Sequence, residues 1–471
     1  MRGAFLLLTG NGAFWLASFV RNLVVARLLS VEDYGIATTF ALTAMLVEMA
    51  SQIGLKQLIV QAEEGEEPRF QSALQGFHLL RGIAAAILLL ALAEPIARFL
   101  GVPEIAWAYH VVALVPLLQG FTHFDVYRFE RRFQYRPGIL MLSLASLTSL
   151  AAVWPLFWLF GDWRVMLAAI LLQEGLQAAL SHVMARRPYR ARLDPALVRR
   201  AVRFGWPLLL NGLLMFAVFH GEKLIAGREL GLAALGIFSM GVTLTLTPTL
   251  LGTKTLQSLL LPRLSRAGGD RFRQFAVTAC EASALVAILT VAGVALLGPV
   301  FVLIVLGPKF EPLLPLLVPL GVAMGVRMMK TGPSVVALSR ARSTLPMLAQ
   351  LPRLASIALA WVVLIRGGDL LDLALIAVAG ELAGVVLAFW LMRGVEGAPA
   401  GWLGRGGTAP ILLMLAVLGA DLLRRHPAAE GLSARLPGSP TPETLVWLAV
   451  ALMLLWGLVL ARGALIAVRR T

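Results

Sequence analysis

Apolar segments long enough to cross a membrane follow one another along the whole chain, and they constrain its fold more than any motif does. Charges, glycines and prolines bound these windows at 4–29, 36–61, 74–100, 104–126, 137–160, 164–185, 200–224, 234–262, 274–306, 312–338, 344–366, 370–393, 408–424 and 443–467. A helix needs about 20 apolar residues to span a bilayer, so the chain has room for about fourteen crossings and short loops. No strand-like alternation competes with this pattern. We therefore predict an all-α polytopic membrane protein without a soluble catalytic domain.

The composition excludes several classes of soluble protein. Apolar residues make up 59% of the chain and charged residues 14%, against about 45–50% and about 25% in a typical soluble domain. The net charge of +15 resides in short loops, which the positive-inside rule explains better than nucleic-acid binding does. Cys280 is the single cysteine, so we expect it to pack as a small hydrophobe, with no intrachain disulfide. The histidines lack H-E-x-x-H spacing, and we expect neither a metal nor a cofactor.

Loop arginines predict the orientation of the chain in the membrane. Dense groups follow the even-numbered windows, at 128–136, 186–200 and 263–273. Such groups stay on the cytoplasmic side, which places both termini in the cytoplasm and the protein in the cytoplasmic (inner) membrane. The loop after the thirteenth window is an exception, because it carries Arg424, Arg425 and Arg435 on the predicted outer side.

Two stretches repeat at a constant offset of about 200 residues. Residues 26–37 align with 227–238, and residues 53–61 align with 254–262. Two halves of six helices each would enter the membrane in the same direction, which is the parallel type of transporter repeat with a site where the repeats meet. We predict an N-terminal six-helix bundle at 1–198, a C-terminal six-helix bundle at 199–395, and an additional helix pair at 396–471.

Several segments resemble one family of membrane transporters. The run VARLLSVEDYG from Val25 to Gly35, with Gly54, Leu55 and Ile59 after it, closely resembles the start of the polysaccharide transporter (oligosaccharide flippase) family. That family belongs to the multidrug/oligosaccharidyl-lipid/polysaccharide exporter superfamily. RFGWPLLLNGLL from 203 to 214 and LGLAALGIFSMG from 230 to 241 resemble the opening of its second half. The resemblance covers about residues 1–395.

The resemblance implies both an architecture and a cargo. It implies a V-shaped pair of helical bundles around a central cavity that opens alternately to either side. The implied cargo is an oligosaccharide on a polyprenyl pyrophosphate, flipped to the outer leaflet for O-antigen, exopolysaccharide or capsule assembly. Related flippases line their cavity with basic residues from the first, second and eighth helices, and Arg21, Lys56 and Lys254 match that pattern by helix and depth.

Intramembrane cations lead to a similar site independently of the family. A charge near the bilayer centre costs at least about 2.5–3.5 kcal/mol and should therefore face water or the bundle interior. Six basic residues meet this description: Arg21, Lys56, Arg81, Lys254, Arg327 and Lys330. Together they would suit a pyrophosphate, although snorkelling toward the interface is an alternative, strongest for Lys56 and Lys330.

Four intramembrane acids are candidates for ion coupling. Glu48, Glu174, Glu281 and Glu381 have no adjacent cation in sequence. Each could relay a coupling ion, but each could instead pair with an arginine or accept hydrogen bonds across helices. Glu381 lies within GELAG at 380–384, a G-x-x-x-G pattern that lets helices approach closely.

The charge balance separates the competing functions. An exporter of drugs or cationic metabolites should concentrate acidic residues in its cavity, whereas here the candidate basic residues outnumber the four candidate acids. A polysaccharide polymerase or glycosyltransferase needs a sizeable outward loop, and loops of that size are absent from the predicted topology. We therefore expect a transporter rather than an enzyme, with a lipid-linked oligosaccharide, membrane lipid and the polymerase and chain-length machinery as partners.

Overall fold

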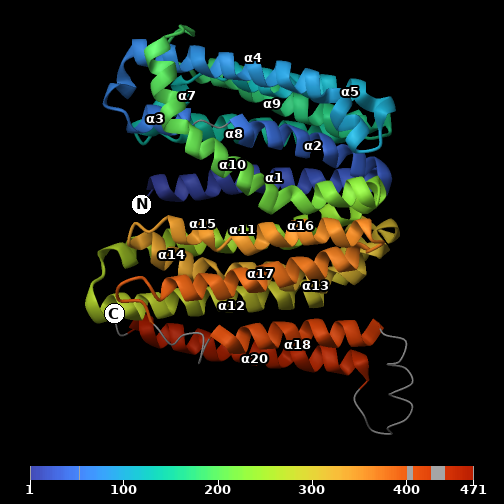
Figure 1. Ribbon diagram of the computed structural model, residues 1–471. Helices are drawn as coiled ribbons and strands as arrows, with labels where there is room; N and C mark the ends of the chain where they lie inside the picture. The colour runs from blue at the N-terminus through green and yellow to red at the C-terminus, as the bar shows by residue number, and fades with distance from the viewer. Residues whose placement is uncertain (1, 52–53, 400–406, 426–440, 470–471) are drawn as a thin grey trace. The chain divides into compact units, whose positions relative to one another are not determined.

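The computed structural model is built from helices throughout its described part (Figure 1). It describes residues 2–51, 54–399, 407–425 and 441–469; within these ranges the side chains of 2–11, 51, 204, 207–208, 442 and 463–469 are not described. No strand occurs in these ranges, so the predicted all-α fold is confirmed. The chain forms two compact units, Met1–Gly236 and Ile237–Thr471.

The first unit contains ten helices and the start of an eleventh among its described residues. Their bounds are α1 (Arg2–Leu28), α2 (Val31–Ser51), α3 (Leu55–Gln61), α4 (Pro68–Phe99), α5 (Ala106–Val112), α6 (Leu114–Gly120), α7 (Asp125–Arg131), α8 (Arg136–Phe160), α9 (Arg164–Met184) and α10 (Pro195–Glu229), with short 3-10 turns η1 (Glu63–Glu66) and η2 (Pro103–Ile105). Within the unit, α8 packs on α1 and α9, and α4 packs on α5 and α6.

The second unit begins within the long helix α11 (Leu232–Arg266). Its other elements are α12 (Gly269–Phe301), η3 (Val302–Leu306), η4 (Pro308–Leu313), α13 (Leu314–Met329), α14 (Thr331–Ser339), α15 (Thr344–Leu348), α16 (Leu351–Ile365), α17 (Leu370–Met392), α18 (Thr408–Arg425) and α20 (Pro442–Arg469). The centre of this unit is α13, which packs against both α12 and α17, and α18 lies beside α20 (Figure 1).

Fewer helices qualify as membrane spans than the fourteen windows predicted. In the described residues, ten helices are long and apolar enough to cross a membrane, or up to twelve if each of two bent pairs is one span. The eighteen-residue helix α18 is not among them, because it carries three charged residues, Asp421, Arg424 and Arg425. Arg435, the third arginine of the predicted loop after the thirteenth window, lies outside the described residues.

Two windows predicted as single helices are bent by more than 40° in the described residues. The window 36–61 divides into α2 and α3, which are bent by 43°; Gly54 adopts a left-handed φ of 66° that favours glycine. The window 104–126 divides into α5, α6 and α7, with a bend of 50° before α7. Hydrophobicity averaged over a window cannot detect either break.

The repeat is visible in local structure at its first segment and absent at its second. Residues 26–37 and 227–238 both cover a helix end, a short turn and the next helix start. The equivalent glycines Gly35 and Gly236 pack together: a Cβ on Gly35 would lie 1.9 Å from the Leu232 carbonyl oxygen and 3.3 Å from the Gly236 nitrogen. The second pair differs, because 254–262 lies inside continuous α11 whereas 53–61 contains the break at Gly54.

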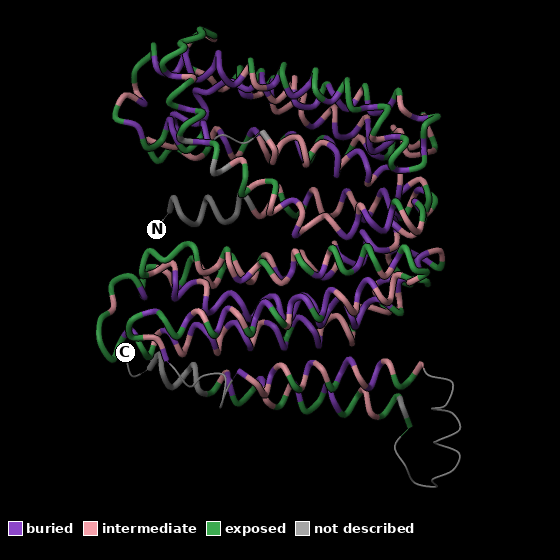
Figure 2. The backbone as a smooth tube through the Cα atoms, in the orientation of Figure 1, coloured by how far each residue is buried: buried purple, intermediate pink, exposed green. Residues whose placement is uncertain are grey.

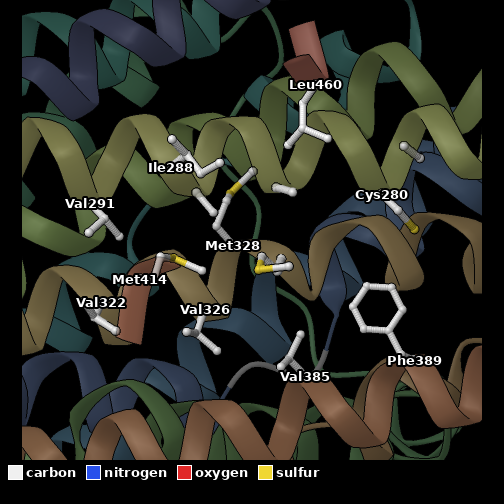
Figure 3. Packing of buried hydrophobic residues seen from close by; sticks show 14 of the residues in the cluster. Cys280, Ile288, Val291, Val322, Val326, Met328, Val385, Phe389, Met414 and Leu460 are labelled. Carbon is white, nitrogen blue, oxygen red and sulfur yellow. The ribbon is translucent and has the colours of Figure 1, made fainter. Parts of the chain in front are cut away.

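The second unit has an apolar interior and an apolar exterior. Ile288, Val322 and Met414 are fully buried in its core, and Cys280 packs there as the small hydrophobe predicted (Figure 3). Its helices carry exposed apolar side chains such as Leu297 at 69% exposure, and Figure 2 shows buried and exposed positions mixed along them. An exterior of this composition is suited to lipid rather than to water.

Candidate functional site

Four charged side chains meet in the interior of the second unit. The carboxylate of Glu381, on α17, is fully buried. Its Oε2 lies 2.7 Å from Lys330 Nζ, and its Oε1 lies 3.4 Å from Arg327 Nε and 3.3 Å from Arg353 Nε. Lys330 joins α13 to α14, Arg327 is in the last turn of α13, and Arg353 is on α16. We call these four residues the Glu381 cluster.

The glycines around Glu381 explain how three helices approach its carboxylate. A Cβ on Gly380 would lie 2.2 Å from Ser356 Oγ on α16. One on Gly384 would lie 2.9 Å from the Ala349 carbonyl oxygen and 3.2 Å from Lys330 Nζ. The G-x-x-x-G pattern therefore acts inside the unit, where missing side chains leave room for the neighbouring backbone and the lysine.

The Glu381 cluster contains more basic than acidic side chains. Three cations contact one carboxylate, and no member of the cluster is more than 9% exposed. Buried charge is tolerated only where it is paired and hydrogen-bonded. Lys330 also donates a hydrogen bond of 3.0 Å to Gln350 Oε1, which satisfies part of its ammonium group. The cluster therefore brings three buried basic side chains to one acid.

The first unit holds a second polar group, centred on Arg21 of α1. Arg21 is 8% exposed and donates from Nη1 to Ser149 Oγ at 2.9 Å and to Gln173 Oε1 at 2.5 Å. Glu174, the next residue on α9, accepts a 3.2 Å hydrogen bond from Gln119 Nε2. Arg21 thereby links three helices and lies beside one of the predicted coupling acids.

Further predicted residues of the first unit interact with this group electrostatically. Lys56 interacts with Glu48 and Arg81, and its Nζ lies 4.9 Å from the centre of the Tyr127 ring. Glu174 interacts with Glu48, Lys56 and Arg21. Lys56 is exposed and Arg81 is half-buried. The cations Arg21, Lys56 and Arg81 and the acids Glu48 and Glu174 thus form what we call the Arg21 group, with one more positive than negative charge.

Two predicted residues of the second unit lie apart from the Glu381 cluster. Lys254 is exposed on α11, and Glu281 is half-buried on α12 beside Cys280. Neither is among the residues that converge on Glu381 in the described part of the chain. The structure therefore brings together three of the five predicted charges of this unit.

Sequence reasoning missed one member of the Glu381 cluster. Arg353 is 2% exposed and lies inside the predicted window 344–366, within the apolar run LPRLASIALAWVVLI. The rule that identified the other intramembrane cations applies to it equally, since an arginine there must face the protein interior. The glutamines 119, 173 and 350 carry no comparable signal.

A third charged network joins the loops of the first unit. Glu66, in η1, lies 2.6 Å from Arg132 Nη2 and 3.4 Å from Arg128 Nη1. The hydrogen bond from Arg132 holds the pKa of Glu66 below its usual range. Asp125 accepts a hydrogen bond of 2.5 Å from Arg128 Nε and one of 2.7 Å from the Arg186 backbone nitrogen. These contacts tie α7 and the segment after α9 to the loop before α4.

Comparison with known proteins gives a family match over most of the chain. The model of the family described as "Polysaccharide biosynthesis protein" matches residues 24–315. The succinoglycan biosynthesis transport protein ExoT of Rhizobium meliloti (strain 1021) is 24% identical over 269 residues, which cover 57% of this chain and 54% of ExoT. The match thus spans about half the length of that relative. An uncharacterized membrane protein in the cps region of Klebsiella pneumoniae is 19% identical over 345 residues, covering 69% of this chain and 68% of that protein.

Solved structures share the fold at low sequence identity. The lipid II flippase MurJ, in an inward closed conformation, matches with a TM-score of 0.70 and 13% identity over 97% of this chain and 98% of MurJ. A multidrug resistance MATE family transporter of the MOP superfamily, in an inward-facing conformation, matches with a TM-score of 0.62 and 15% identity over 81% of this chain and 93% of that chain.

Proposed function

Because this chain belongs to the polysaccharide biosynthesis protein family of membrane transporters, we propose that it flips a polyprenyl-pyrophosphate-linked oligosaccharide from the cytoplasmic to the outer leaflet. The movement would follow alternating access and would supply O-antigen, exopolysaccharide or capsule assembly. The chain acts in this proposal as a transporter and not as an enzyme.

The gathering of basic side chains is the observation that carries this proposal. Three buried cations contact Glu381, and the Arg21 group combines the buried Arg21 with the half-buried Arg81 and the exposed Lys56. Cations in a low-dielectric interior attract phosphate strongly, and arginine can bind it through two parallel hydrogen bonds. An exporter of cationic drugs would require the opposite balance, so the charges favour an anionic cargo over the multidrug alternative.

The candidate residues divide between cargo binding and coupling. Arg21, Lys56, Arg81 and Lys254 would hold the pyrophosphate. Arg327 and Lys330 already contact Glu381, so a phosphate must displace that carboxylate to reach them. Such an exchange of one anion for another would couple cargo to movement of α13 and α17. Glu174, hydrogen-bonded by Gln119, is the acid we assign first to a coupling ion, with Glu48, Glu281 and Glu381 as further candidates.

The loop arginines support a specific placement in the cell. The segments that hold Arg128, Arg132 and Arg187 would lie on the cytoplasmic side of the inner membrane, since dense positive charge stays on that side. Both termini would then be cytoplasmic. Polysaccharide polymerase and chain-length proteins would receive the flipped cargo on the other side.

Flipping in proteoliposomes tests the assignment of the cargo residues. A fluorescent polyprenyl-diphosphate-linked saccharide reports its arrival in the opposite leaflet when an external quencher reaches it. Each phosphate contact is worth about 1.5–3 kcal/mol, so Arg81→Ala or Lys254→Ala should slow flipping roughly tenfold or more. Arg81→Lys and Lys254→Arg should recover part of the rate, because positive charge is the first requirement.

Matched controls remove exposed cations elsewhere. Arg98 pairs with Glu94 on the surface of α4, and Arg271 is exposed at the start of α12. Arg98→Ala and Arg271→Ala should flip cargo at the wild-type rate. If Arg81→Ala and Lys254→Ala also did so while remaining folded, the cationic binding mechanism would be wrong for these residues.

A further inference from the structure

A hollow in the first unit is lined by residues outside the charged groups described above. It has a volume of about 620 Å³ and opens between α4 and the first turns of α10. Leu80 forms the wall from α4, and Leu193 lies just before α10. Val198, Val202 and Trp206 follow one face of α10 at helical spacing. These side chains make an apolar trough whose members Leu193 and Trp206 are 62% and 59% exposed.

Two arginines border the same hollow. Arg199 and Arg203 are one turn apart on α10, so their guanidinium groups lie on the same side of the helix. No acidic residue is among those lining the hollow in the described part of the chain. The neighbouring Arg200 is instead paired with Glu64 at 3.1 Å. The hollow therefore combines apolar walls with two cations that no lining acid neutralises.

The backbone on both sides of the hollow is fixed by the fold. A neighbouring face of α10 is buried, with Ala201 fully buried and Leu197 8% exposed in a cluster with Leu74 of α4. The segment before α10 lies against α4, where the Arg192 nitrogen donates to the Ser72 carbonyl at 3.0 Å. Asp194 caps α10 by accepting from the Ala196 and Leu197 nitrogens. The start of α10 is thus held next to α4 by buried apolar contacts and a backbone hydrogen bond.

Trp206 and the two arginines are residue types that suit the boundary between lipid and water. Tryptophan is enriched at the membrane interface, and arginine there contacts lipid phosphates.

We propose that this hollow binds one anionic phospholipid of the membrane, with Arg199 and Arg203 holding its phosphate and the trough formed by Leu80, Val202 and Trp206 receiving the upper part of an acyl chain. Charge complementarity favours a lipid with net negative charge over a zwitterionic one. The bound lipid would join the start of α10 to α4. None of the cargo residues proposed above lines this hollow, and the proposal does not depend on what the protein transports.

Native mass spectrometry of the full-length protein tests this site. The purified chain is titrated with phosphatidylglycerol or with phosphatidylcholine of identical acyl chains. Wild type should retain one phosphatidylglycerol at least tenfold more tightly than phosphatidylcholine. The double variant Arg199→Ala/Arg203→Ala should lose that preference. Val202→Trp, which fills the trough without changing charge, should weaken phosphatidylglycerol binding several-fold.

The control variant is Arg190→Ala, which removes an exposed cation of the same segment outside the hollow and should bind phosphatidylglycerol like wild type. If Arg190→Ala and the double variant lost phosphatidylglycerol affinity equally, the lipid would be held by diffuse surface attraction, and the proposed site would be wrong. Unchanged binding by Val202→Trp would overturn the role of the trough. Displacement of phosphatidylglycerol by lower concentrations of a polyprenyl diphosphate would overturn the assigned occupant, because the hollow would then be a cargo site.

Discussion

Replacing Glu381 with glutamine should destabilise the second unit strongly. The substitution preserves shape but removes the charge that Lys330, Arg327 and Arg353 contact at 2.7, 3.4 and 3.3 Å. Removing one partner of a buried ion pair costs about 3–5 kcal/mol, because the other charge is left without compensation. Here three cations lose their common partner, so we expect at least the lower end of that range.

Equilibrium unfolding of the purified protein in mixed micelles measures this loss. The control is Glu94→Gln, which breaks the exposed pair with Arg98 and should change the unfolding free energy by less than about 1 kcal/mol. Combining Glu381→Gln with Lys330→Met should recover part of the stability, since one of the uncompensated cations is gone. Two results would refute the view that this carboxylate holds the cluster together. One is that Glu381→Gln is as stable as wild type, and the other is that the double variant is less stable than Glu381→Gln.

Three further predictions concern a close glycine contact, the hydrogen bonds of Arg21 and the pH dependence of stability. Gly35→Val should prevent stable folding, because its side chain would overlap the Leu232 carbonyl, whereas Gly293→Ala, with nothing within 4 Å, should leave the melting temperature unchanged or higher. Ser149→Ala should lower the unfolding free energy less than Arg21→Met does, because Gln173 still accepts from Arg21. The pKa of Glu66 is lowered in the folded protein, so its ionised carboxylate stabilises the fold at pH values above the unfolded-state pKa of about 4.3. This stabilisation is lost as the pH falls through the folded-state pKa. The melting temperatures of wild type and Glu66→Gln should therefore converge in acid.

The sequence was sufficient for the class of fold and for the family. Long apolar windows define membrane helices because lipid leaves the backbone few alternatives. The resemblance read from the run at Val25–Gly35 is confirmed, and the family match begins at residue 24. The breaks at Gly54 and before α7 were missed because averaged hydrophobicity does not register one left-handed residue or a short turn.

The candidate site was predictable only in part. The cost of intramembrane charge identified Arg327, Lys330 and Glu381 as important, but not that they contact one another. Their meeting depends on Gly380 and Gly384 bringing α16 and Lys330 close to α17, which is a property of packing. The predicted domain boundaries, the membrane orientation and the roles of the site residues stay predictions.

Flipping of two lipids by the wild-type protein tests whether it recognises the diphosphate of a lipid-linked saccharide. Proteoliposomes would contain a labelled saccharide linked to polyprenol either through a diphosphate or without any phosphate. We predict that the diphosphate-linked saccharide reaches the opposite leaflet much faster than in protein-free vesicles, while the uncharged one crosses at the protein-free rate. Equal rates for the two lipids, or transport of a cationic dye with no flipping of the diphosphate-linked saccharide, would contradict this prediction.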